Sequence, residues 1–175
     1  MESFIDVGMI GEMRDRYLYR AKRIDNGEWT QGNLIWSNDS EVGYEAIIIP
    51  TNDSNMYTKG EGRGDLGFEN WHKVDKDTIC QCTGLKDKND ELIFENDIVR
   101  FDIYKYEKMI SRVVSDVQWC DEIWSFSIVV NEKGNRGTLG HVLEFNKEIE
   151  AIGNKFDNPE LLEERSQEEE EDYEK

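Results

Sequence analysis

The chain has 175 residues, and 37% of them are hydrophobic, which is enough for one sizeable core and a smaller second one. Its 39 acidic and 21 basic residues give a formal net charge of −18, and such a surface repels phosphate backbones. We therefore expect no direct binding to DNA or RNA, and attraction to basic protein surfaces. The longest uninterrupted apolar run, residues 46–49, is too short to span a membrane, and three cysteines fit a reducing compartment, so the expected location is the cytoplasm.

The acidic charge is spread along the chain. Residues 159–175 hold nine acids and two bases, so this segment contributes −7 and the rest of the chain still carries −11. We expect a short C-terminal helix that begins near Pro159, with Leu161 and Leu162 as its apolar contacts, followed by a solvated acidic tail.

The first part of the chain predicts antiparallel strands. Residues 1–12 are expected to be an extension, and residues 13–78 a β-rich region. Strand composition is found in three segments: 17–24, 29–36 and 45–50. Asn26-Gly27 between the first two is a strong signal for a tight hairpin turn. Residues 52–70 are interpreted as a long, glycine-rich connection.

Residues 79–158 predict a small SH3-like β-barrel. The expected strands are short and bounded by turns: 97–101, 113–119, 125–130 and 148–152. Residues 141–146 fit either a helical turn or a short strand. The predicted fold class is thus mainly β, a β-rich α+β chain with an N-terminal antiparallel region, a small barrel, a short C-terminal helix and an acidic tail.

Two blocks of sequence carry a resemblance to a known family. Residues 83–99 run Thr-Gly-Leu-Lys-Asp-Lys-Asn-Asp-Glu-Leu-Ile-Phe-Glu-Asn-Asp-Ile-Val, which is turn chemistry between apolar strand segments. Residues 152–162 run Ile-Gly-Asn-Lys-Phe-Asp-Asn-Pro-Glu-Leu-Leu. Both blocks, in this order, resemble the YopX family of phage and prophage proteins, and the resemblance extends over about 14–162. It implies a phage context but supplies no reaction, cofactor or catalytic residue. Asp90 stands where the family usually has Gly, which suggests a turn that does not need a positive φ.

The candidates for enzyme or metal chemistry are weak. Residues 62–67 fit the letters G-x-G-x-x-G, but no strand precedes them and no helix follows, so we expect a loop rather than a dinucleotide site. Cys80 and Cys82 lack the C-x-x-C spacing of zinc sites and are interpreted as core residues. Cys120, His72 and His141 complete no recognisable nucleophile or metal motif. We expect no enzyme activity, no cofactor and no metal.

Aromatic residues near acidic ones offer a better candidate site. Trp119 and Trp124 flank a predicted turn at Asp121-Glu122, where a barrel often exposes a binding edge. Exposed tryptophans at an acidic rim are good anchors for a protein partner. The candidate partner-binding residues are Asp116, Trp119, Asp121, Glu122 and Trp124.

Two function classes remain. The first is a non-enzymatic phage protein that binds a basic, nucleic-acid-handling host protein, such as a CRISPR effector or a restriction enzyme, and occupies its nucleic-acid-binding surface in the host cytoplasm. The alternative is an oligomeric binder of a small nucleotide signal, with Gly62, Arg63 and Gly64 as its anion site. A phage accessory enzyme is a distant third. Homo-oligomerisation stays open, and no membrane contact is expected.

Overall fold

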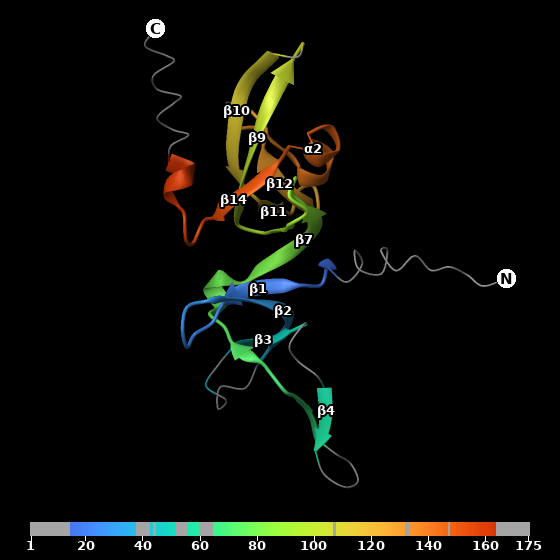
Figure 1. Ribbon diagram of the computed structural model, residues 1–175, viewed down its shortest axis with the longest axis vertical. Helices are drawn as coiled ribbons and strands as arrows, with labels where there is room; N and C mark the ends of the chain where they lie inside the picture. The colour runs from blue at the N-terminus through green and yellow to red at the C-terminus, as the bar shows by residue number, and fades with distance from the viewer. Residues whose placement is uncertain are drawn as a thin grey trace, which may run out of the picture. The chain divides into compact units, whose positions relative to one another are not determined.

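The computed structural model describes residues 15–37, 43, 45–51, 56–59, 65–106, 108–131, 134–146 and 148–163, and for 56–59, 65–66 and 105 it describes only the backbone. The chain divides into two compact units, Met1–Cys82 and Thr83–Lys175. The mainly β fold class is confirmed, since antiparallel strands make up most of the described residues (Figure 1). The predicted extension 1–12 and the tail after residue 163 lie outside the described residues.

The first unit is a sheet with the strand order β6-β3-β2-β1-β7. Its strands are β1 (Tyr19–Lys22), β2 (Trp29–Trp36), β3 (Ala46–Pro50), β6 (His72–Lys73) and β7 (Cys80–Lys86), with a 3-10 helix, η2 (Lys76–Thr78), before β7. The predicted hairpin is confirmed, since β1 pairs antiparallel with β2, but its turn is longer than the expected two residues: residues 23–28 join the strands, and Gly27 has a φ of +73°. Asn26 stabilises the turn because its Oδ1 accepts a hydrogen bond from the backbone N–H of Glu28 at 3.0 Å.

Small and branched apolar side chains form the core of this unit. Ala21, Ala46, Ile48 and Val74 are buried, and Tyr19, Leu34 and Ile79 pack against them. Gly32 lies where β2 approaches β3 so closely that a Cβ would come within 2.0 Å of the backbone oxygen of Ile49. The absence of a side chain at Gly32 therefore permits this strand pairing.

The long connection expected at 52–70 is corrected by the structure. It contains a hairpin of β4 (Met56–Lys59) and β5 (Asp65–Phe68), paired from Met56 with Phe68 to Lys59 with Asp65. Glycine disfavours strand interiors, yet Gly67 lies within β5 and pairs with Tyr57.

The second unit contains the end of β7, which pairs with β8 (Leu92–Phe94), and two three-stranded sheets. One has the order β10-β9-β14, formed by β10 (Lys108–Asp116), β9 (Asp97–Lys105) and β14 (Glu150–Asn154). The other has the order β11-β12-β13, formed by β11 (Gln118–Cys120), β12 (Ser125–Val129) and β13 (Arg136–Thr138). The ambiguous segment is a helix, α2 (Leu139–Phe145), and residues 160–163 are helical where a C-terminal helix was expected.

The expected closed SH3-like barrel is wrong in one respect. The described strands of this unit belong to separate sheets and do not close on themselves. The inner faces of these sheets and α2 enclose one core: Ile93, Val99, Phe101, Val113, Val117, Ile128, Leu139 and Ile149 are buried together. The helix covers part of the core that a closing strand would otherwise cover, because Leu139 is buried and Val142 and Leu143 pack on the cluster.

Candidate functional site

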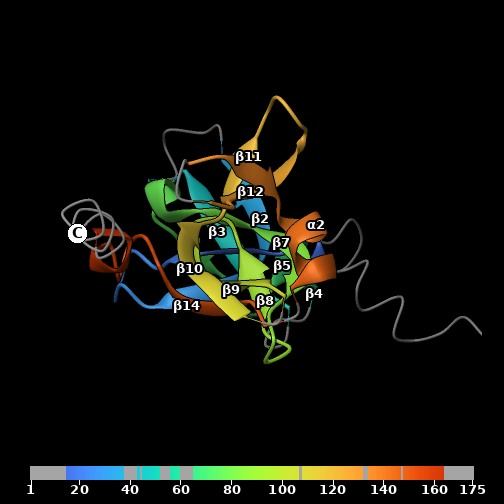
Figure 2. The same cartoon turned by 90° about the horizontal axis from the view of Figure 1, so that it is seen from above.

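The turn between β11 and β12 gathers most of the predicted partner-binding residues. The two strands pair from Gln118 with Ser127 to Cys120 with Ser125, so residues 121–124 form the turn, which projects beyond both strands in Figure 2. We call residues 119–124 the acidic loop. Trp124 is 80% exposed and has a φ of +51°, a backbone conformation that a bulky residue seldom adopts.

Trp119 anchors the base of the acidic loop. Its indole N–H donates a hydrogen bond to Oδ1 of Asp121 at 2.8 Å, and its ring meets Phe126 edge to face with centroids 5.3 Å apart. The Asp121 carboxylate is thereby held beside an aromatic surface. Glu122 is exposed, and so is Ile123, which sequence reasoning overlooked although it lies between an acid and a tryptophan in a predicted turn.

Asp116, the fifth predicted residue, has a different place. Its carboxylate accepts a hydrogen bond from the Gln118 side chain and lies 3.8 Å from Nη1 of Arg136. Arg136 also donates to the side chain and backbone oxygens of Ser127, at 3.0 and 2.9 Å. Arg136 therefore links β13 to β10 and β12, and Asp116 lies beside a basic side chain.

The first family block, 83–99, is a structural turn. The carboxylate of Asp87 is buried and accepts hydrogen bonds from the backbone N–H groups of Asn89 (2.8 Å), Glu91 (3.1 Å) and Ala151 (3.1 Å). Asp97 is also buried and accepts one from the backbone N–H of Phe94 at 2.7 Å. These carboxylates hold the backbone of the turns in place. We therefore interpret the block as a structural element of the fold.

The expectation for Asp90 is wrong. Its φ is +66°, so the turn does use the left-handed conformation, and Asp adopts it where the family usually has Gly. Asp and Asn tolerate this region because their short polar side chains bond locally. Asn96, in the next turn, has the same φ.

The second family block lies against the first. The backbone N–H of Lys155 donates to the oxygen of Asn96 at 3.0 Å, and Asn154 pairs with Asp97 between β14 and β9. Gly153 leaves room for Asn158, since a Cβ there would lie 2.5 Å from the Asn158 Oδ1. The two blocks thus form one connected scaffold that includes the first residues of β9 and the last residues of β14.

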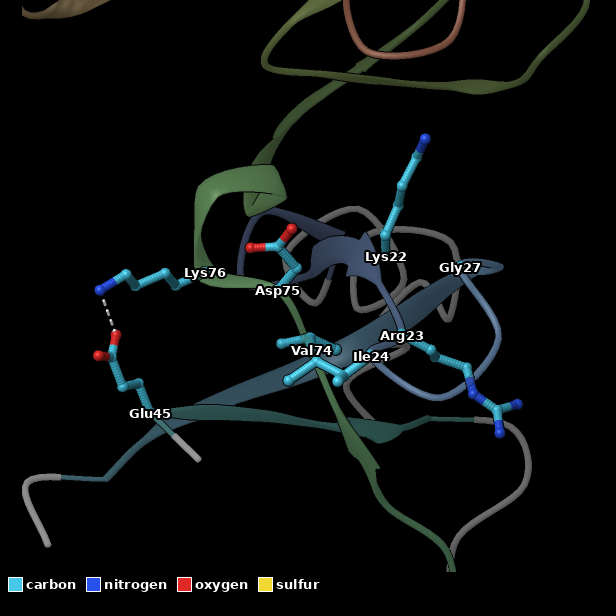
Figure 3. Close-up of a pocket in the computed structure, with 8 residues that line it drawn as sticks. All are labelled: Lys22, Arg23, Ile24, Gly27, Glu45, Val74, Asp75 and Lys76. Atoms are coloured by element: carbon cyan, nitrogen blue, oxygen red, sulfur yellow. Dashed lines mark ion pairs between the residues drawn. The ribbon is translucent and has the colours of Figure 1, made fainter. Parts of the chain in front are cut away.

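An open pocket of about 490 Å³ lies in the first unit (Figure 3). Ile24 and Val74 line its apolar part, and its charged residues are Lys22, Arg23, Glu45, Asp75 and Lys76. Lys76 pairs with Glu45 at 2.6 Å, which raises the lysine pKa above its ordinary value. Arg23 pairs with Asp25 at 2.6 Å, and this hydrogen bond lowers the pKa of Asp25. An anion in this pocket would compete with carboxylates, because Lys76 pairs with Glu45 and Arg23 pairs with Asp25.

Other candidate residues from the sequence lie outside the acidic loop. Gly62, Arg63 and Gly64 lie outside the described residues. Cys80 and Cys82 are buried in β7, in agreement with their interpretation as core residues. Within the described ranges, no three His, Cys, Asp or Glu side chains are grouped so that they could hold a metal ion. None of the helices described is long and apolar enough to cross a membrane.

Comparisons with known proteins identify relatives. The structure is similar to the crystal structure of protein EF1440 from Enterococcus faecalis, with a TM-score of 0.52 and 26% sequence identity over 82% of this chain and 96% of that chain. No curated protein matches the sequence. The sequence pattern of the YopX protein family matches residues 18–163. This match covers both sequence blocks and most of both units, and the chain therefore belongs to the YopX protein family.

Proposed function

We propose that this chain is a phage-encoded, non-enzymatic binding protein that inhibits a basic, nucleic-acid-handling host protein. It acts in the host cytoplasm by occupying the surface that nucleic acid would use, as an anti-CRISPR or anti-restriction protein does. The phage context is what the YopX resemblance implies. The observation that carries the mode of action is the acidic loop, which presents a highly exposed tryptophan beside carboxylates.

The apolar part of the loop supplies affinity. Trp124, Ile123 and Trp119 are 80%, 46% and 43% exposed. A contiguous group of exposed apolar side chains usually marks an interaction site, and tryptophan is the residue most enriched among those that dominate binding energy. Holding Trp124 at a φ of +51° costs folding free energy, which is a reason to look for function at this turn.

The charged residues of the second unit attract the protein to a basic partner. Residues 83–163 hold 17 acids and 10 bases. Among the side chains that the structure describes, five of these bases are in ion pairs with neighbouring acids: Lys86, Lys88, Arg100, Arg112 and Arg136. The field around this unit is therefore negative, which speeds encounter with a basic surface and acts mainly on the association rate.

The test begins with a partner captured from phage-infected host lysate and then purified. Trp124→Ala should raise its dissociation rate at least about tenfold, because an anchor is lost. Glu122→Gln should mainly lower the association rate, and this effect should fade as salt rises. Trp36→Ala is the matched control, since Trp36 is 56% exposed in the first unit. Equal effects of Trp36→Ala and Trp124→Ala would contradict the proposed site.

Binding of a small nucleotide signal is the second candidate, and the pocket in Figure 3 favours it. Its apolar part would accept a base, and Lys76 would exchange its exposed carboxylate partner for phosphate, a small cost because such pairs are weak. Calorimetric titration with nucleotides distinguishes the two candidate functions. Saturable heat that Lys76→Gln abolishes would support nucleotide binding in the pocket. The absence of heat would rule out nucleotide binding and retain partner binding by the acidic loop.

A further inference from the structure

The hairpin of β9 and β10 carries a second exposed apolar surface. Four large side chains near its turn are exposed: Tyr104 (59%), Tyr106 (91%), Met109 (47%) and Ile110 (55%). We call residues 104–110 the hairpin tip. Figure 1 shows the two strands as one long hairpin, and none of these four residues belongs to the buried core. Tyr106 has a φ of +51°, the same unusual conformation as Trp124.

The charge of the hairpin tip differs from that of the rest of the unit. Lys105 and Lys108 are opposite each other in the register of β9 and β10. With Glu107 between them, residues 104–110 carry two bases and one acid, in a unit where acids outnumber bases. By sequence the tip is thus a basic, tyrosine-rich segment, and Lys108 is its described, exposed base, while the acidic loop is acidic and tryptophan-rich.

These two surfaces lie at opposite ends of one strand. β10 begins at Lys108, in the tip, and ends at Asp116, two residues before β11 and the acidic loop. A strand of nine residues spans about 27 Å, at roughly 3.4 Å a residue. The loop of one chain therefore cannot reach its own hairpin tip, and contact between the two surfaces requires two chains.

We propose that the hairpin tip of one chain binds the acidic loop of a second copy of this chain. Lysine over the face of a tryptophan is favourable, and so is lysine near the Asp121 and Glu122 carboxylates. The tip and the loop can pair reciprocally in a two-fold dimer, or head to tail in a ring or an open chain of copies. It covers the loop that the proposed function assigns to a host partner, so self-association and partner binding compete.

The contact is weak. Seven exposed apolar side chains, three from the loop and four from the tip, bury on the order of 1,000 Å² in total, the lower limit for a specific interface. The net charge of −18 on each copy opposes association in general, but charges more than about 8 Å apart are largely screened at physiological salt. The charges at the contact then decide whether two copies bind.

Charge reversal tests the proposal with purified full-length protein alone. Wild-type protein should associate with rising concentration in sedimentation velocity. Lys108→Glu, in the tip, and Glu122→Lys, in the loop, should each weaken association at least about tenfold. Lys155→Glu and Glu148→Lys change the charge equally at exposed positions elsewhere in the unit, and should leave association within about twofold of wild type.

Mixing the two reversed variants decides between this contact and any other. In an equimolar mixture the tip of Lys108→Glu, with a charge of −1, faces the loop of Glu122→Lys, whose charge is zero instead of −2, so the repulsion is relieved. The unchanged tip and loop face each other, and association should return to near the wild-type level. A wild-type protein that stays monomeric at several hundred micromolar, or a mixture that does not associate, would overturn the proposal. Lys108→Glu should still bind the captured host partner, so failure of self-association does not depend on failure of the proposed function.

Discussion

Removal of the buried Asp87 carboxylate tests whether the first family block, residues 83–99, acts as a structural scaffold. Asp87→Ala removes the acceptor of three backbone N–H groups, those of Asn89, Glu91 and Ala151. A hydrogen bond to a charged group is worth about 1.5–3 kcal/mol, and a buried donor left without a partner costs about 1–3 kcal/mol. Asn89 and Glu91 are exposed, so water replaces part of what they lose, and most of the cost falls on the Ala151 N–H. We expect a loss of about 3 kcal/mol in the free energy of unfolding of the second unit.

The assay is urea denaturation followed by tryptophan fluorescence, with hydrogen exchange at the Ala151 amide as a local probe. Fluorescence reports on both units, since Trp29, Trp36 and Trp71 lie in the first and Trp119 and Trp124 in the second, so the exchange probe identifies the unit affected. The transition of the second unit should move to lower urea, and the Ala151 amide should exchange faster. Glu91→Ala is the control, because it removes an exposed acid from the same turn and should change stability by less than about 0.5 kcal/mol. If Asp87→Ala destabilises no more than Glu91→Ala, the scaffold interpretation of the block is refuted.

Three further outcomes follow from local geometry. Asp90→Ala and Asp90→Gly both remove the carboxylate, but φ at this position is +66°, which glycine adopts more readily than alanine. In the same denaturation assay, the alanine variant should therefore be less stable than the glycine variant by about 1 kcal/mol. Gly32→Ala places a Cβ 2.0 Å from the Ile49 oxygen and should destabilise the first unit by about 3 kcal/mol in urea; a change below about 1 kcal/mol would show that β2 and β3 separate easily. The hydrogen bond from Arg112 lowers the pKa of Asp102, so its stabilisation is present above the ordinary carboxyl pKa and is lost as pH falls through the lowered value. Arg112→Gln should make the free energy of unfolding depend less on pH below the ordinary carboxyl pKa, and an unchanged pH dependence would count against the pair.

The parts of the fold that were predicted correctly have local causes. Asn26-Gly27 specifies its turn by backbone chemistry that needs no tertiary contact, and alternation placed Cys80 and Cys82 on a buried face. The β4–β5 hairpin was missed because glycine-rich sequence around it resembles an irregular connection. The helix α2 could not be distinguished from a strand, since a seven-residue segment is too short for its period to show.

The sequence predicted the turn that carries the candidate site, but not which of its side chains are exposed. Turn position can be read from sequence, so the acidic loop was found, but exposure depends on which side chains the rest of the fold covers. Asp116 and Glu122 have the same charge in the sequence, and only packing places the first against Arg136 and leaves the second exposed. The hairpin tip was missed because Lys105 and Lys108 interrupt the apolar pattern that would have predicted two long strands.

Competition with nucleic acid is the most direct test of the proposed inhibition. The captured partner is immobilised, and the association of wild-type protein with it is measured before and after the partner is saturated with its DNA or RNA, across a salt series. If the protein occupies the nucleic-acid-binding surface, pre-bound nucleic acid should abolish binding, and association with the empty partner should slow as salt rises. Undiminished binding to the loaded partner, or an association rate that salt does not change, would contradict the proposal that the acidic loop acts by occupying that surface.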